Sequence, residues 1–159
     1  MSEVKAAPEQ EPAQSVFNIE KLYVKDLSLE IPHAPGIFLE SDAPQIDLQL
    51  NTSAVAIEDG LFEVTVTATV TAKLVEKEKV MFLVEVKQAG VFQVRNIPEG
   101  ERDPILAVVC PNILYPYLRE VVSDVVVRAG FAPVILSPIN FDALYQQKNQ
   151  QEAESEVKH

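Results

Sequence analysis

Apolar and polar residues alternate with a period of two through the middle of this chain. In the clearest run, from Phe62 to Leu74, every second residue is apolar and every residue between is Thr, Glu or Lys. Side chains of a strand point to alternate faces, so this run predicts a strand with one buried and one wet face. The pattern resumes after the charged turn at 76–79, with expected inward positions Val80, Phe82, Val84 and Val86.

Two earlier segments show the same alternation. One runs from Phe17 to Ile31, and its pattern is blurred at Leu22 and Val24, which indicates a bend or a bulge in a long strand. The other places Ile46, Leu48 and Leu50 between polar residues. Consecutive half-buried strands with a short turn predict a four-stranded antiparallel sheet.

The period changes to that of a helix after residue 102. Asp103 and Pro104 are typical of a helix start, and Pro111 is expected to disturb the helix that follows. A second helix has an apolar stripe from Leu114 to Ala129. Gly130 is expected to end it and Asn140 to begin a last helix. Strands followed by helices predict an α+β fold, with helices on the sheet face of Phe62, Val64, Val66, Phe82 and Val84.

Length and composition favour one domain with polar ends. The chain has 159 residues, 47% of them hydrophobic. We expect a mobile tail at 1–15, a folded domain at 16–145 and a mobile polar tail at 146–159. Asp and Glu number 24 against 13 Lys and Arg, giving a net charge of −11. An anionic surface repels phosphate, which argues against nucleic acid and acidic membranes as partners.

Residues that carry chemistry are few. There are two histidines, one cysteine and five glycines, and no spacing suggests a catalytic set, a metal site or a phosphate loop. We therefore expect a protein that is not an enzyme and has no cofactor, with Cys110 buried as a small apolar residue. Residues 1–14 do not resemble a signal peptide, and no apolar run suggests membrane insertion, so a cytoplasmic location is expected.

Four segments resemble the SecB family of export chaperones, in the family's order. They are YVKDLSLE at 23–30, PHAP at 32–35, VCPNILYPY at 109–117 and SPINFDALY at 137–145. The resemblance spans residues 17–145. It implies a homotetramer, a dimer of dimers, that binds unfolded precursor proteins without ATP and delivers them to the motor ATPase SecA.

The resemblance also implies two sites. The family's docking positions for SecA fall on Asp26, Glu30, Leu83 and Glu85. The alternation independently turns Leu83 and Glu85 to the wet face. By position, Ile46, Leu48, Leu50 and Tyr145 resemble residues that line a groove for unfolded clients. Alternation alone leaves open whether the three strand residues face that groove or the core.

A different class of protein also fits the residue pattern. A small-molecule carrier, or an isomerase-like α+β cup, would place a pocket between sheet and helices. Such a protein should have a closed pocket with a polar group inside, whereas a chaperone should have open apolar grooves.

Overall fold

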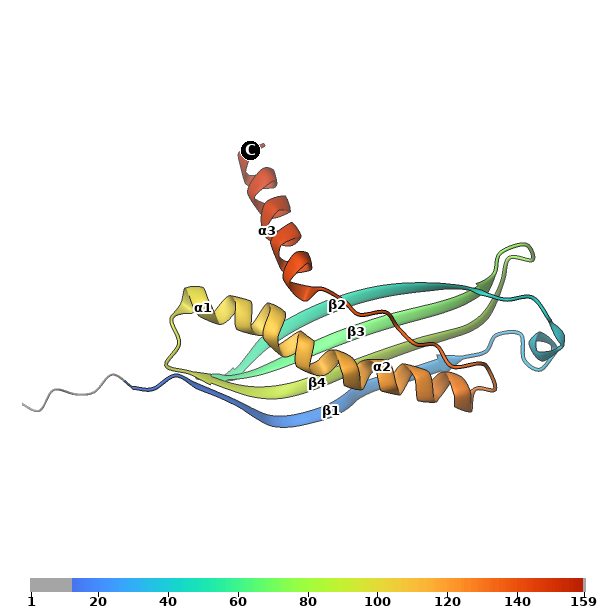
Figure 1. The fold of residues 1–159 in the computed structure, drawn as a ribbon, viewed down its shortest axis with the longest axis horizontal. Coiled ribbons are helices and arrows are strands. Elements are labelled where there is room, and N and C mark those ends of the chain that lie inside the picture. Colours follow the sequence, from blue (N-terminus) through green and yellow to red (C-terminus); the bar gives the residue numbers. More distant parts are fainter. Residues whose placement is uncertain (1–12, 159) are drawn as a thin grey trace, which may run out of the picture.

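The computed structural model describes residues 13–158, which form a sheet followed by helices. The strands are β1 (Val16–Glu30), β2 (Gln45–Glu58), β3 (Leu61–Leu74) and β4 (Lys79–Arg95). A short 3-10 turn, η1 (Gly36–Leu39), lies between the first two strands. After the sheet come α1 (Glu99–Pro104), a π-helical turn η2 (Ile105–Val109), α2 (Cys110–Arg128) and α3 (Phe141–Val157). In Figure 1, α2 lies across one face of the sheet and α3 projects away from the body.

The sheet has the order β1-β4-β3-β2, and all neighbours are antiparallel. The predicted four-stranded antiparallel sheet is therefore confirmed, with β3 and β4 central and β1 and β2 at the edges. The bulge expected in β1 is also confirmed, because its register shifts twice, between Ile19 and Lys21 and between Val24 and Asp26. The second strand extends to Glu58, seven residues beyond the predicted Asn51.

The expected inward position of Val80 is wrong. Lys73 pairs with Val80 and Ala72 pairs with Phe82, so Met81 is an extra residue at a bulge. Paired residues share a face, which puts Val80 on the wet side beside Lys73, while Met81 is buried. Phe82, Val84 and Val86 face the helix as predicted.

Residues Glu99–Arg128 form one continuous helical run through α1, η2 and α2. It begins after Pro98 and not at Asp103, because Glu99 and Glu101 place negative charge at the helix N-terminus. Pro111 changes the helix without ending it. In η2 the Cys110 N–H bonds to the carbonyl of Ile105, five residues back. This wider turn makes room just before the proline, whose ring clashes with a regular helix.

The predicted end of α2 and the predicted start of α3 are both confirmed. Gly130, with φ of 94°, follows α2, and its N–H bonds to Val127 while the Phe131 N–H bonds to Val126. This pair of bonds satisfies carbonyls at the helix end. Asn140 caps α3, because its Oδ1 accepts a hydrogen bond of 3.0 Å from the Ala143 N–H.

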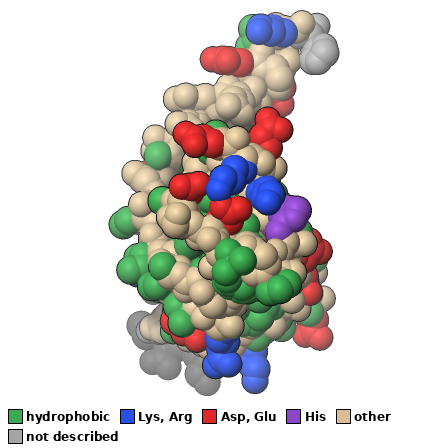
Figure 2. All heavy atoms as spheres, turned by 90° about the vertical axis from the view of Figure 1, so that its right-hand side faces the viewer, with side chains coloured by type: hydrophobic (Ala, Val, Ile, Leu, Met, Phe, Trp, Pro, Cys, Tyr) green, Lys and Arg blue, Asp and Glu red, His purple; other side chains and the backbone are tan. Residues whose placement is uncertain are grey.

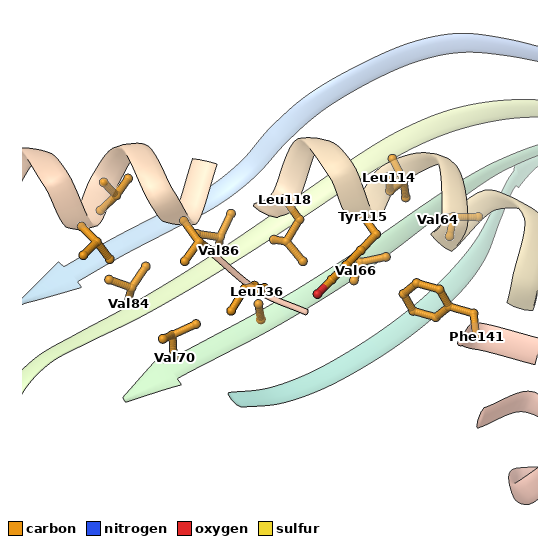
Figure 3. Packing of buried hydrophobic residues seen from close by; sticks show 14 of the residues in the cluster. Val64, Val66, Val70, Val84, Val86, Leu114, Tyr115, Leu118, Leu136 and Phe141 are labelled. Atoms are coloured by element: carbon orange, nitrogen blue, oxygen red, sulfur yellow. The ribbon is translucent and has the colours of Figure 1, made fainter. Parts of the chain in front are cut away.

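The core lies between α2 and the central strands (Figure 3). The inner-facing valines labelled there on the central strands, and the helix residues above them, are fully buried: Val64, Val66, Val70, Val84, Val86, Leu114 and Leu118. The predicted helix-covered face is therefore confirmed. The run Glu99–Arg128 is long and apolar enough, by length and composition, to cross a membrane. Its apolar stripe instead packs on β3 and β4.

The two segments predicted as tails have different outcomes. Most of the predicted tail at 1–15 lies outside the described residues. Within 146–159, the residues through Val157 continue α3 as a regular helix. Gln, Glu and Ala, which favour helices, dominate this stretch. Mobility of this segment stays a prediction.

Candidate functional site

An open groove of about 650 Å³ separates the edge strand β2 from α3. Its apolar lining comes from β2, from the helical run and from α3, and consists of Leu50, Ala54, Leu106, Ala107, Phe141, Leu144 and Tyr145. Polar side chains complete the lining, among them Asp103, Lys148, Asn149 and Glu152. The groove therefore combines an apolar floor with charged groups of both signs.

The start of α3 is fixed firmly beside this groove. Phe141 is buried and meets the ring of Tyr115 edge-on, with ring centroids 5.8 Å apart. The Tyr115 hydroxyl donates to the carbonyl of Ser137 in the segment before α3. With Asn140 capping the helix, the first turn of α3 is held to the body, and it presents Leu144 and Tyr145 to the groove.

The structure places two of the four predicted client-binding residues in the groove and two outside it. Leu50 and Tyr145 line the groove together, from opposite walls. Leu48 is half-buried against the core, and Ile46 is exposed near the start of β2. All three β2 residues lie on the helix side, because they pair with Ala72, Val70 and Ala68 of the inner face.

Residues that the sequence did not single out also line the groove. Leu106 and Ala107 belong to the π-turn. The sequence pattern did not predict this turn, so it did not place these two residues in a site. Lys148 and Glu152 lie in the segment predicted as a tail. Their spacing from Leu144, at intervals of four, was the available signal for a continuing helix face.

Apolar and charged side chains adjoin at the end of the molecule formed by the β1–β2 connection and the β3–β4 turn (Figure 2). Phe38 stacks on Phe131, with centroids 5.2 Å apart, and Leu39 is 90% exposed. The Lys77 ammonium contacts the carboxylates of Glu40 and Asp42. These ion pairs join the β1–β2 connection to the β3–β4 turn.

The four predicted docking residues meet on the outer face of the sheet, away from α2. Glu30 pairs directly with Leu83, and Glu85 pairs with Ser28, one step along. Asp26 shares this face, because β1 is regular from Asp26 to Glu30. Among residues 13–158, Asp26, Glu30 and Glu85 form no ion pair. Glu85 also accepts a hydrogen bond from Thr69, and Lys87 lies opposite Asp26 on the same face. The surface thus offers three carboxylates without an ion pair, two of them beside the half-buried Leu83.

A second acidic position on the outer face is compensated. The Glu63 carboxylate accepts a hydrogen bond from the Tyr23 hydroxyl, and its Oε1 lies 2.6 Å from Lys25 Nζ. The Lys25 bond, followed by the Tyr23 bond, lowers the pKa of Glu63, so it stays ionised. Burial, followed by this hydrogen bond, raises the pKa of Tyr23 to about 12. Sequence analysis did not find this cluster, which forms across strands.

Reactive groups are scarce in the described chain. Cys110 is fully buried, and this burial raises the pKa of its thiol to about 12. The prediction of a buried apolar cysteine is therefore confirmed. Residues 13–158 contain no group of three or more His, Cys, Asp or Glu side chains placed to hold a metal ion. What the geometry offers is an open apolar groove and an acidic face.

Comparison with known proteins agrees with the sequence resemblance. The family described as "Preprotein translocase subunit SecB" matches residues 10–152. The chain belongs to the SecB family of protein-export chaperones. Among SecB relatives, the protein-export protein SecB of Nitrosomonas eutropha is 64% identical over 149 residues, which cover 94% of this chain and 91% of that protein. SecB of Neisseria meningitidis is 59% identical, with coverage of 91% and 97%.

A solved structure shares the SecB fold. The SecB-like chaperone of Mycobacterium tuberculosis, solved in complex with a ChAD peptide from the HigA1 antitoxin, matches with a TM-score of 0.63. It is 19% identical, and the match covers 77% of this chain and 90% of that one. Membership of the SecB family decides between the two functions expected from sequence in favour of the chaperone.

Proposed function

We propose that this chain works in the cytoplasm as a homotetramer that holds unfolded precursor proteins and passes them to SecA. It does so by binding alone, with no catalytic step and no nucleotide. The observation that carries the proposal is the open groove between β2 and α3, whose lining includes a set of apolar side chains from both elements. A carrier of small molecules needs a pocket that covers most of its ligand, which this groove does not provide.

The groove suits an extended, apolar client segment. It runs along β2, an edge strand that pairs with β3 alone within the described residues. An extended chain presents side chains alternately, so every second one can enter the floor at Leu50 and Tyr145. The charged residues Lys148 and Glu152 flank that floor and tolerate clients of different sequence.

Polar substitutions in the groove test this role. In a Leu144→Gln/Tyr145→Gln variant, affinity for an unfolded precursor should fall roughly tenfold, because two apolar contacts are lost. Glutamine preserves helix propensity in α3. Val157→Gln is the matched control, since Val157 is 86% exposed at the far end of the same helix. Equal client affinity in both variants, measured by titration calorimetry, would remove the groove from the proposal.

Uncovered apolar surface supports the tetramer. Helix α2 packs on β3 and β4. On the same face of the sheet, β1 carries a row of apolar side chains, each at least a third exposed: Phe17, Ile19, Val24, Leu27 and Leu29. The buried Gln88 pairs with Val24 in this row, and its Oε1 has no partner within residues 13–158. A second copy of the chain would cover the row and supply a donor.

The acidic outer face is the proposed docking surface for SecA. Asp26, Glu30 and Glu85 form no ion pair among the described residues. Glu30 and Glu85 lie beside Leu83, and Asp26 lies further along β1, opposite Lys87. This arrangement fits a small basic segment with one apolar side chain, as expected of the zinc-bearing C-terminal end of SecA. Each exposed charge contributes about 0–1 kcal/mol, so docking needs several of them and weakens with salt.

Charge reversal tests the docking surface. In an Asp26→Lys/Glu85→Lys variant, binding to the SecA C-terminal segment should be abolished while client holding survives. Glu58→Lys is the control, because this exposed acid lies at the β2–β3 turn. If the reversed protein binds as tightly as the control at every salt concentration, the docking site is wrong.

A further inference from the structure

A bulge in β1 places two neighbouring residues of opposite charge on the outer face. Register is lost between Val24 and Asp26, so Lys25 has no partner of its own in β4. Asp26 pairs with Lys87 and shares the outer face. Lys25 reaches the same face, where it meets Glu63. Without the bulge, adjacent residues would point to opposite sides of the sheet.

Glu63 holds the Lys25 ammonium at a fixed place. The carboxylate is only 19% exposed and is gripped by two donors, Tyr23 and Lys25. Tyr23 is itself half-buried over the small residue Ala89, its partner in β4. The anion is therefore anchored in the sheet, whereas the lysine side chain, 47% exposed, is the part that could move.

The place of this ammonium decides whether a second positive charge approaches Asp26, whose cross-strand partner in β4 is already Lys87. Lys25 and Asp26 are adjacent in the chain, and salt bridges to neighbouring carboxylates are within reach of a lysine side chain. In the structure Lys25 contacts Glu63, and Asp26 is left without an ion pair among the described residues. An ammonium released from Glu63 would lie beside Asp26 and reduce its attraction for a basic partner.

We propose that Glu63 is a positioning residue for SecA docking: it draws Lys25 away from Asp26 and so keeps the docking surface acidic. The inference rests on the proposed docking at Asp26, Glu30, Leu83 and Glu85. The partner it concerns is a basic polypeptide segment. Glu63 itself makes no contact with that partner and acts through the lysine.

The arrangement predicts a specific pattern in a double-mutant cycle. Glu63→Gln frees Lys25 and should weaken binding of the SecA C-terminal segment roughly two- to fivefold, the range of an exposed charge interaction. The salt dependence of binding should become shallower. Lys25→Gln should bind at least as tightly as the unaltered protein. The double variant should regain that affinity, because no lysine remains to compete for Asp26.

Two controls separate positioning from other effects. Glu58→Gln removes one negative charge at the β2–β3 turn without freeing a lysine, and should change affinity much less than Glu63→Gln. Tyr23→Phe removes the other donor but leaves the Lys25–Glu63 contact, and should bind normally. Affinities are measured on the full-length chain by titration at several salt concentrations.

Each outcome decides the matter. Rescue in the double variant supports the inference. Equal weakening in Glu63→Gln and in the double variant would overturn it, since Glu63 would then contact the partner or support the fold. No change in any of these variants, while Asp26→Lys/Glu85→Lys abolishes binding, would also overturn it and leave the docking surface standing. Unchanged binding after that charge reversal would reject the docking surface and this inference together.

Discussion

The central and edge strands of this sheet carry the same apolar alternation but differ in what covers it. Leu29 of β1 lies directly beside Val84 of β4, on the same face of the sheet. Val84 is completely buried under α2, whereas Leu29 is 39% exposed, and its neighbour Leu27 is 46% exposed. One strand spacing, about 4.8 Å, separates these two environments.

The difference arises because one helix is narrower than four strands. A helix with side chains is about 10–12 Å across, which covers two or three strands. Helix α2 packs on β3 and β4 and leaves the helix-side residues of the two edges for other chains. In our proposal β1 is covered by a second copy of the chain and β2 by a client.

The largest expected effect is a truncation in the covered region. Leu118→Ala should lower the free energy of unfolding by about 2–5 kcal/mol, because Leu118 is fully buried between α2 and the sheet. Leu27→Ala should cost about 1 kcal/mol or less within one chain, since much of this side chain is already exposed. Urea denaturation of both variants, at a protein concentration where light scattering shows monomers, measures the two losses. Equal losses would show that the two environments do not differ.

A smaller effect on the fold, but a clear one on assembly, is expected at the edge. Leu27→Ser/Leu29→Ser should leave the far-ultraviolet circular dichroism unchanged and shift the proposed tetramer towards smaller species. The reason is that the row on β1 loses two apolar side chains that a second copy would bury. Light scattering across a dilution series measures the shift. Val55→Ser serves as control, because Val55 is exposed on the outer face of β2. A persistent tetramer in the double variant would place the interface elsewhere.

The smallest expected effect concerns the outer face and its dependence on pH. Glu63 has a pKa below the ordinary 4.5, first because of its bond to Lys25. A lowered folded-state pKa contributes stability above the unfolded-state value, which is lost as pH falls through the folded-state value. The unaltered protein should therefore lose stability below about pH 4.5, by no more than about 1 kcal/mol from this pair. Urea denaturation of Glu63→Gln from pH 3 to 7 should show a flatter profile; an identical profile would contradict the assignment.

Much of the fold could be predicted because alternation and capping are local signals. The inner face of β3, the Asn140 cap and the end of α2 at Gly130 each follow from residues close together in the chain. The errors at Val80 and Asp103 have a common cause. At Val80 one extra residue at a bulge moves the expected position to the other face, and at the helix start the predicted N-cap lies five residues after the observed one. A period detected over many residues fixes neither position.

The candidate sites were predictable to different degrees. Alternation turned Leu83 and Glu85 to the outer face, whereas the positions Asp26 and Glu30 came from the family resemblance. The pairing of β1 with β4, which no local pattern predicts, brings them together. Leu50 and Tyr145 meet across the groove, but no sequence signal distinguished Leu50 from Ile46. The Tyr23–Lys25–Glu63 cluster could not be predicted, since it needs a bulge and contacts between residues 38 or 40 positions apart.

The π-turn η2 has a consequence for insertions and deletions in this protein. Buried positions recur at intervals of four through the helical run, at Leu106, Cys110, Leu114, Leu118, Val122 and Val126. One residue of a regular helix corresponds to a rotation of about 100°. Deleting a single residue from Ile105–Val109 would let the wide turn close into a regular one, so the flanking helix would keep its phase. Deleting a residue from the regular part of α2 would instead rotate everything before it by about 100°. In that second case Leu106 and Asp103 would leave the groove. The wide turn is therefore the place where the helical run can lose one residue while the same side chains still line the groove.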